Sequence, residues 1–249
     1  MTIETEVTEE NSEDRRCRQR YGARVSERDE YARRWPQFGL RIDIDGAHLE
    51  PPTDPQVEIL ALRAAQPGAV LPLADSHFVK WLHGRTPEDI EQQRAERIRS
   101  NRDLTDRPGW TLDLAVIVDD EPVGLQSVSG FDQWPHRRII GTTSWLFAPY
   151  QRGGLGTRCR AAILELAFAH LGAEAAKSWA LEENRGSIAV STNLGYQQID
   201  RHVIVENGRE LTELVYEITS ERWLTSPPRH RYTPVIIGAQ PVVTLLAAP

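Results

Sequence analysis

The sequence has few of the residue types and patterns that by themselves indicate a disulfide framework, a metal site or a membrane span. Only two of its 249 residues are cysteines, Cys17 and Cys159, which excludes a disulfide framework and a zinc site built mainly on thiolates. The seven histidines show no H-x-x-x-H spacing, so no metal site is expected. No stretch reaches the ~20 apolar residues of a membrane span, and the acidic start, MTIETEVTEE, argues against a secretory signal. These absences predict a cytoplasmic protein without a metal or a membrane anchor.

Lysine is also scarce, because Lys80 and Lys177 are the only lysines among 29 basic residues. We interpret the arginine bias as the coding bias of a GC-rich bacterial genome. The 36 acidic residues leave a net charge of −7, which disfavours nucleic-acid binding and weakly favours a cationic substrate. A hydrophobic content of 40% is typical of a folded globular protein.

The composition divides the chain into three regions. Residues 1–39 form a charged arm, expected to be partly disordered with one helix that docks through Tyr31 and Trp35; a partner-binding arm is the alternative. Residues 40–224 carry the patterns of one folded domain. Residues 225–249 form a proline-rich tail whose last 18 residues carry no charge. We expect this tail to cover the core or to add an edge strand to its own sheet or to another chain. A homodimer is therefore one expected assembly.

Hydrophobic periodicity predicts an α+β fold with one central sheet in residues 40–224. Thr86 is the expected cap of the second helix, and Gly172 is the expected stop of the third. The order of elements is β-α-α-β-β-β-α-β-α-β-β. The expected strands are 40–45, 111–118, 122–130, 137–147, 175–183 and a hairpin over 197–218 that turns at Asn207-Gly208; the expected helices are 51–66, 86–101, 157–171 and 184–196.

A glycine-rich turn, QRGGLG at 151–156, lies directly between a predicted strand and the longest predicted helix. Its glycines let several backbone N–H groups point into one concavity, and the helix N-terminus adds further donors and a positive dipole end. We expect Arg152, Arg158 and Arg160 to add positive charge there. A phosphate or pyrophosphate is the natural occupant, and a tight turn without a ligand is the alternative.

Two common nucleotide motifs do not fit this turn. The G-x-G-x-x-G fingerprint belongs in an early βαβ unit, and a P-loop requires a lysine that is absent here. The segment Gln151-Arg152-Gly153-Gly154-Leu155-Gly156 does match Q/R-x-x-G-x-G/A, and so resembles the pyrophosphate loop of the GNAT acyl-CoA N-acyltransferase superfamily. Asn184-Arg185-Gly186-Ser187, followed by Gly195 and Tyr196, resembles the N-x-x-S…G-F signature of the branch that contains the ribosomal-protein N-terminal acetyltransferases.

This resemblance implies an α+β fold whose mixed, mainly antiparallel sheet is splayed at a V, with helices on both faces. The V would lie where strand 137–147 parts from strand 175–183. Acetyl-CoA is the implied co-substrate, without a metal, and the implied acceptor is the amine of a peptide N-terminus or of a small molecule. The implied acyl-CoA contacts are Trp145, Leu146, Phe147, Gln151, Arg152, Gly153, Gly154, Leu155, Gly156, Thr157 and Asn184.

The expected catalytic residues are Ser187 and Glu182. Many members of the superfamily protonate the leaving thiolate with a tyrosine, but that position is Ser191 here, so Ser187 is the candidate acid. Glu182, beside Glu183 at the end of a predicted strand, is the candidate base, with His136 or a water relay as alternatives. Two other functions stay open: transfer of another acyl group such as succinyl, and a catalytically silent acyl-CoA-binding sensor or scaffold.

Overall fold

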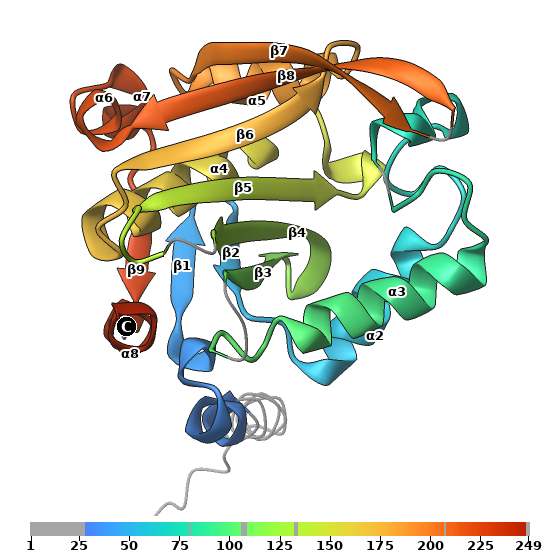
Figure 1. The fold of residues 1–249 in the computed structure, drawn as a ribbon. Helices are drawn as coiled ribbons and strands as arrows, with labels where there is room; N and C mark the ends of the chain where they lie inside the picture. The colour runs from blue at the N-terminus through green and yellow to red at the C-terminus, as the bar shows by residue number, and fades with distance from the viewer. Residues whose placement is uncertain (1–27, 80, 106–108, 132–133, 207, 248–249) are drawn as a thin grey trace, which may run out of the picture.

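The computed structural model describes residues 28–79, 81–105, 109–131, 134–206 and 208–247. They form one nine-stranded sheet in the order β7-β8-β6-β5-β4-β3-β2-β1-β9 (Figure 1). Every neighbouring pair is antiparallel except β5 and β6, which are parallel. The predicted fold class is therefore confirmed. The strands are β1 (Arg41–Ile44), β2 (Ala47–Glu50), β3 (Trp110–Val118), β4 (Glu121–Gly130), β5 (Ile139–Leu146), β6 (Ala175–Leu181), β7 (Gln197–Glu206), β8 (Arg209–Thr219) and β9 (Val235–Ile237).

Helices cover both faces of the sheet, with α2 and α3 against one face and α4 and α5 against the other (Figure 1). Thr86 caps α3 by accepting a hydrogen bond from the Asp89 N–H (3.1 Å), as its sequence predicts. The helices are α2 (Asp54–Ala64), α3 (Pro87–Ser100), α4 (Leu155–Glu165), α5 (Arg185–Asn193), α6 (Ser220–Leu224), α7 (Pro227–Arg231) and α8 (Ala239–Ala247), with short 3₁₀ turns η1 (Pro36–Gly39), η2 (Leu73–Phe78) and η3 (Ala148–Tyr150) and a π-helical turn η4 (Leu166–His170) that continues α4.

Two segments differ from the sequence-based expectation. The single strand expected at 40–45 is a hairpin, in which β1 turns back into β2 at Gly46, whose φ of 73° suits glycine. The helix expected at 157–171 begins two residues earlier and changes to a π-helical turn after Glu165. The predicted β7–β8 hairpin is present, although Asn207 of its turn lies outside the described residues.

The described part of the N-terminal arm docks onto the domain. Residues 28–34 are helical, and the Tyr31 hydroxyl donates to the Asp54 carboxylate (2.7 Å) while its ring stacks on Phe38 (4.7 Å between centroids). The guanidinium of Arg102 lies 5.5 Å from the Trp35 ring centroid. Tyr31 and Trp35 thus make the expected contacts, whereas residues 1–27, including Cys17, lie outside the described residues.

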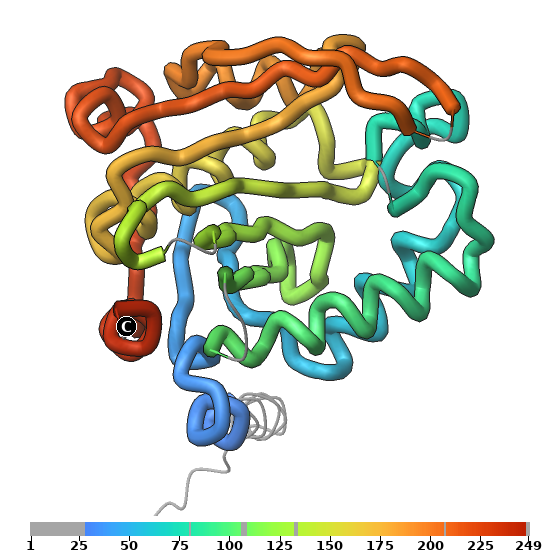
Figure 2. The backbone as a smooth tube through the Cα atoms, viewed as in Figure 1, coloured from blue at the N-terminus to red at the C-terminus, as the bar shows by residue number. Residues whose placement is uncertain are grey.

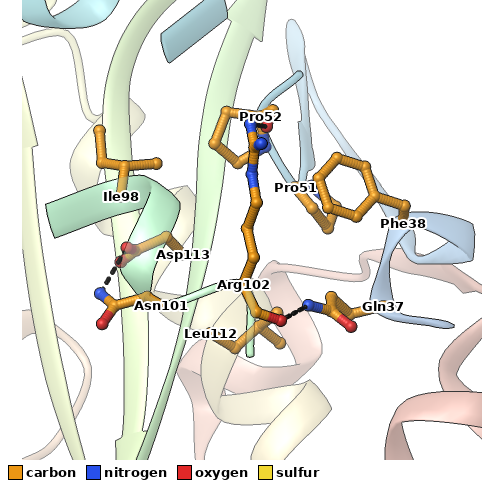
Figure 3. Close-up of a pocket in the computed structure, with 9 residues that line it drawn as sticks. All are labelled: Gln37, Phe38, Pro51, Pro52, Ile98, Asn101, Arg102, Leu112 and Asp113. Carbon is orange, nitrogen blue, oxygen red and sulfur yellow. Dashed lines mark hydrogen bonds between the residues drawn. The ribbon is translucent and has the colours of Figure 1, made fainter. Parts of the chain in front are cut away.

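A small cavity of about 10 Å³ lies where this arm meets the loop between α3 and β3 (Figure 3). The Gln37 side chain donates to the Arg102 carbonyl, and the Asn101 amide donates to the Asp113 carboxylate (2.8 Å). Burial raises the pKa of Asp113, and hydrogen bonds from Ser127 and Asn101 oppose that rise. This volume holds one water molecule at most, so the cavity is a packing feature rather than a substrate site.

The C-terminal tail both covers the core and extends the sheet. Strand β9 pairs with β1, and α8 buries Val242 and Leu246, whose carbonyl accepts a hydrogen bond from the Trp134 indole (2.7 Å). In α7, the Arg229 guanidinium forms two 3.0 Å hydrogen bonds with the Glu165 carboxylate. The tail therefore has both of the roles expected for it within its own chain: it covers the core and adds an edge strand to the sheet. The boundaries at residues 40 and 224 stay a prediction.

The buried carboxylate of Glu50 predicts an acid-sensitive step in stability. Burial alone would raise its pKa, but hydrogen bonds from His48 and Gln56 and the charge of Arg28 lower it from 4.5 to about 2. Because the pKa is lower in the folded state, the stabilisation is complete above pH ~4.5 and is lost as the pH falls toward 2. In the wild type, the free energy of unfolding should therefore fall by about 1 kcal/mol more per pH unit below pH ~4.5 than in Glu50→Gln.

Urea unfolding of the wild type and Glu50→Gln between pH 6 and pH 3.5 measures this difference. Glu58→Gln is the matched control, because the Glu58 side chain is 59% exposed and should leave the wild-type pH dependence nearly unchanged. Equal slopes for the wild type and Glu50→Gln would contradict the prediction.

Candidate active site

The site is built around the one parallel strand pair. Strands β5 and β6 pair only at Ile139, Ile140 and Gly141, opposite residues 175–177. Beyond Gly141, β5 continues along β4 as far as Leu146, and β6 continues along β8 as far as Leu181. The two strands therefore diverge, as the backbone trace in Figure 2 shows, and their facing edges form a V. This is the splayed sheet that the resemblance implies.

The strand register decides which backbone groups face the V. The Phe147 N–H donates to the Val123 carbonyl (2.9 Å), so it points to β4 and away from the V. Because hydrogen-bonding direction alternates along a strand, Trp145 shares that orientation, while Leu146 and Ser144 direct their backbone groups into the V. Of the three expected backbone contacts, Leu146 alone faces the V. Ser144 joins it and was missed from the sequence.

The glycine turn presents a row of backbone donors at the open end of the V. Among the described residues, the N–H groups from Arg152 through Thr157 have no hydrogen-bond acceptor. Gly154 adopts the left-handed conformation (φ 79°) as the N-cap of α4, and the turn is exposed at residues 152–154. The Gln151 amide instead donates to the carbonyls of Val70 (2.6 Å) and Leu146 (2.8 Å), which fixes the turn against β5. The turn can therefore bind an anion through its backbone.

Two of the three expected arginines lie at this turn, and the third does not. Arg152 is exposed within it, and Arg158 donates to the Gly153 carbonyl (3.3 Å). The Arg160 guanidinium is buried and donates to the hydroxyls of Ser178 and Ser144. The expectation for Arg160 was wrong because residues two apart on an α-helix project about 200° apart, so they cannot both face the turn.

Helix α5 begins directly after β6 and carries the second motif. Asn184 is its N-cap, with its side-chain oxygen accepting from the Ser187 N–H (3.1 Å), and the Asn184 amide nitrogen has no partner among the described residues. Ser187 is half-buried. Ser191, at the position where the resemblance implies a tyrosine in many members, is fully buried and its hydroxyl lacks a partner in the described part of the chain.

The two carboxylates that follow β6, Glu182 and Glu183, are each paired with a basic side chain. Arg201 binds Glu182, with 3.1 Å between Nη2 and Oε2, and His77 binds Glu183, with 3.2 Å between Nε2 and Oε2. The other ring nitrogen of His77 lies 3.1 Å from the Ala74 carbonyl oxygen. The predicted base, Glu182, is therefore an ion-pair partner in this conformation. No local signal could indicate the second pair, because His77 and Glu183 are 106 positions apart.

Comparison with known proteins agrees with this geometry. A family model described as an acetyltransferase (GNAT) domain matches residues 59–197, more than half of the chain, and this stretch includes the V, the glycine turn and α5. The chain belongs to the GNAT acetyltransferase family. It is therefore an acyl-CoA-dependent N-acetyltransferase, and acetyl-CoA is the co-substrate of this family.

Solved structures show the same GNAT fold at low sequence identity. RimJ of Mycobacterium smegmatis, in complex with CoA-disulfide, matches with a TM-score of 0.59 and 17% identity over 82% of this chain and 92% of that one. A GCN5-related N-acetyltransferase from Brucella melitensis matches with a TM-score of 0.59 and 17% identity over 76% and 83% of the two chains. The microcin C7 self-immunity acetyltransferase MccE, in complex with acetyl-CoA and AMP, has a TM-score of 0.57 and 17% identity over 70% and 93%.

The GNAT domain also exposes aromatic rings on one face of the V. Phe131 and Trp179 are 37% and 38% exposed and meet edge to face, 6.0 Å apart, against Gly141. Trp145, on the same face of β5 by strand alternation, packs edge to face on Trp81 at 5.6 Å. This face is the one covered by α2 and α3. Arg160 lies on the opposite face, so the two sides of the V differ in chemistry.

Three further features of the described residues concern the buried cysteine, metal-binding clusters and membrane-spanning helices. Burial raises the pKa of the Cys159 thiol to about 12, so it is no thiolate nucleophile at neutral pH. Within the described ranges no group of three or more His, Cys, Asp or Glu side chains is placed to hold a metal ion. No helix in those ranges is long and apolar enough to cross a membrane.

Proposed function

We propose that this GNAT acetyltransferase moves the acetyl group of acetyl-CoA directly to a primary amine, either a peptide N-terminus or a small-molecule amine. The observation that carries the proposal is the junction of the V with the glycine turn. Unpaired strand edges lie next to a row of N–H groups that have no acceptor among the described residues. An extended amide-containing arm that ends in a pyrophosphate satisfies both sets of groups.

In this proposal the pyrophosphate lies on the turn, and the pantetheine arm lies in the V. The donors from Arg152 to Thr157 and the dipole of α4 bind the phosphates, with Arg152 and Arg158 adding charge. The Leu146 N–H and the Ser144 backbone pair with the pantetheine amides as an added strand does. The Asn184 side-chain amide is free to contact the same arm, because only its oxygen is used to cap α5.

The acceptor approaches over the aromatic face. Phe131 and Trp179 are exposed there, and ring faces attract ammonium groups. The net charge of −7 favours the same cationic class of acceptor. The amine must lose a proton before attack. Since Arg201 binds Glu182, proton loss through water is the route that the geometry favours, and the Ser187 hydroxyl is the proposed proton donor to the leaving thiolate.

The second candidate is a catalytically silent acyl-CoA-binding module. The pairing of Glu182 with Arg201 and the serine at position 191 favour it, because both remove side chains that could move protons. Such a module would bind acetyl-CoA at the same turn and release no thiol.

Thiol release from acetyl-CoA in the presence of a panel of amines, run beside calorimetric titration with acetyl-CoA, separates these functions. Turnover with at least one amine supports the transferase, while binding without turnover supports the silent module. Absence of both binding and turnover would overturn the acyl-CoA proposal as a whole.

Replacing Ser187 with alanine tests its role as the acid. We expect kcat to fall by about 100-fold, the lower end of the roughly 10²–10⁴-fold that general acid catalysis contributes, while the Kd for acetyl-CoA stays within about twofold. Ser191→Ala is the matched control on the same helix and should change kcat little, because its hydroxyl is buried. An unchanged kcat for Ser187→Ala removes Ser187 from the mechanism.

A further inference from the structure

Arg160 is a buried cation that lacks an acidic partner in the described part of the chain. It is 4% exposed, and its guanidinium donates to the Ser178 hydroxyl (3.1 Å) and the Ser144 hydroxyl (3.1 Å) while Nε has no acceptor. The Tyr196 phenol lies beside it, and burial raises the pKa of that phenol, so it stays neutral. By contrast, the largely buried Arg102 is paired with Asp54 at 2.9 Å.

The position of this cation is set by the two diverging strands. Ser144 is on β5, three residues past Gly141, where the pairing ends, and Ser178 is on β6, one residue past Lys177. The Arg160 guanidinium therefore bridges the two arms of the V near its closed end, on the face covered by α4. The exposed rings of Phe131 and Trp179 lie on the opposite face.

A buried guanidinium without a counterion is costly, and an anion that forms beside it offsets that cost. In acyl transfer from a thioester to an amine, negative charge develops on the leaving sulfur. If the amine enters from the aromatic face, the leaving sulfur is directed toward the α4 face, where the Arg160 charge lies. A fixed positive charge lowers the barrier most when it faces a group whose negative charge grows in the transition state.

We propose that Arg160 binds and stabilises the thiolate that leaves the acyl-CoA, an inference that rests on the proposed function. The amine nitrogen bonds to the carbonyl carbon, the C–S bond breaks, and its electron pair stays on sulfur. Arg160 keeps its protons and stabilises the thiolate by charge, because an arginine guanidinium does not act as an acid in proteins. The proton lost by the amine goes to water, and the thiolate is protonated by Ser187, which regains a proton from water.

The test is the ionisation of the thiol of CoA bound to the intact protein, followed by the ultraviolet absorbance of the thiolate as the pH is raised. With wild-type protein the thiol pKa of bound CoA should lie at least one unit below that of free CoA. In Arg160→Met it should return to within a few tenths of a unit of free CoA, and kcat should fall by about 100-fold. Arg160→Lys keeps the charge and should recover part of both effects.

Arg41→Met is the control, because Arg41 is an exposed arginine of β1 paired with Asp43; it should leave the thiol pKa and kcat unchanged. If CoA does not bind the wild-type protein, the proposed function fails. If CoA binds but its thiol pKa matches that of free CoA, the Arg160 proposal fails, whether or not Arg160→Met folds. If CoA binds with a lowered thiol pKa that Arg160→Met leaves in place, the proposal fails as well.

Discussion

Replacing Gly154 with aspartate is expected to abolish acetyl-CoA binding, with a Kd at least 100-fold higher by calorimetry. Gly154 is the N-cap of α4 and lies among the backbone donors proposed to hold the pyrophosphate. A carboxylate there occupies the concavity and repels a dianion at short range. The fold should persist, because a Cβ at this position meets only the end of the Arg158 side chain, at 3.4 Å.

Two variants separate the charge at residue 154 from backbone strain. Gly154→Ala carries the strain of a left-handed φ of 79° without the charge. It should lower the free energy of unfolding by about 1–2 kcal/mol, and it should raise the Kd for acetyl-CoA far less than Gly154→Asp does. Gly208→Asp adds the same charge at a φ of 74° in the β7–β8 turn and should bind acetyl-CoA as the wild type does. A Gly154→Asp protein that binds within threefold of the wild type would contradict a pyrophosphate site at this turn.

Gly124→Ala should lower both the free energy of unfolding and the affinity for acetyl-CoA, because it displaces the backbone of β5. A Cβ at residue 124 would lie 2.3 Å from the Trp145 carbonyl oxygen and 2.8 Å from the Leu146 Cα. These are backbone atoms, so β5 itself must move, and Leu146 is the residue whose N–H faces the V. We expect a loss of about 2–3 kcal/mol in the free energy of unfolding and an acetyl-CoA Kd raised by at least about tenfold. Denaturant unfolding and calorimetry measure the two effects.

Gly130→Ala is a matched control at the other end of β4. Its Cβ would lie 2.3 Å from the Trp110 indole nitrogen, so it also introduces a severe overlap, but with a side chain far along the strand from Leu146. It should lower stability while leaving acetyl-CoA affinity nearly unchanged. Equal losses of affinity in the two variants would show that general destabilisation, and not displacement of β5, accounts for the effect.

The sequence predicts those parts of the fold and site whose signals are local. The β3–β4 hairpin, the glycine turn and the cap of α3 each depend on neighbours within a few residues, so periodicity and capping rules indicate them. Strand β2 was missed because AHLE has little β-branched character. The pairing of β9 with β1 joins opposite ends of the domain, and no local pattern in the proline-containing tail specifies it.

Within the candidate site, residue types were easier to predict than directions. The QRGGLG turn can be recognised from its residue types alone. Which backbone groups of β5 face the V, those of Leu146 and Ser144, depends on the register against β4, and only the three-dimensional pairing sets that register. The inward direction of Arg160 follows from helix geometry once the start of α4 is known. The contacts Glu182–Arg201 and Glu183–His77 join distant segments and could not be predicted from local sequence.

The pairing of β9 with β1 has a consequence for synthesis on the ribosome. Val235 follows Ile44 by 191 positions (235 − 44), yet the two strands are neighbours in the finished sheet. A growing chain therefore presents β1 as an open edge throughout the translation of the catalytic segments, and open edges invite pairing with other nascent chains. That edge is covered only when β9, the last of the described strands to be synthesised, pairs with β1. A ribosome that pauses before Val235 leaves the edge open, so aggregation on polysomes should depend on how quickly the tail is translated.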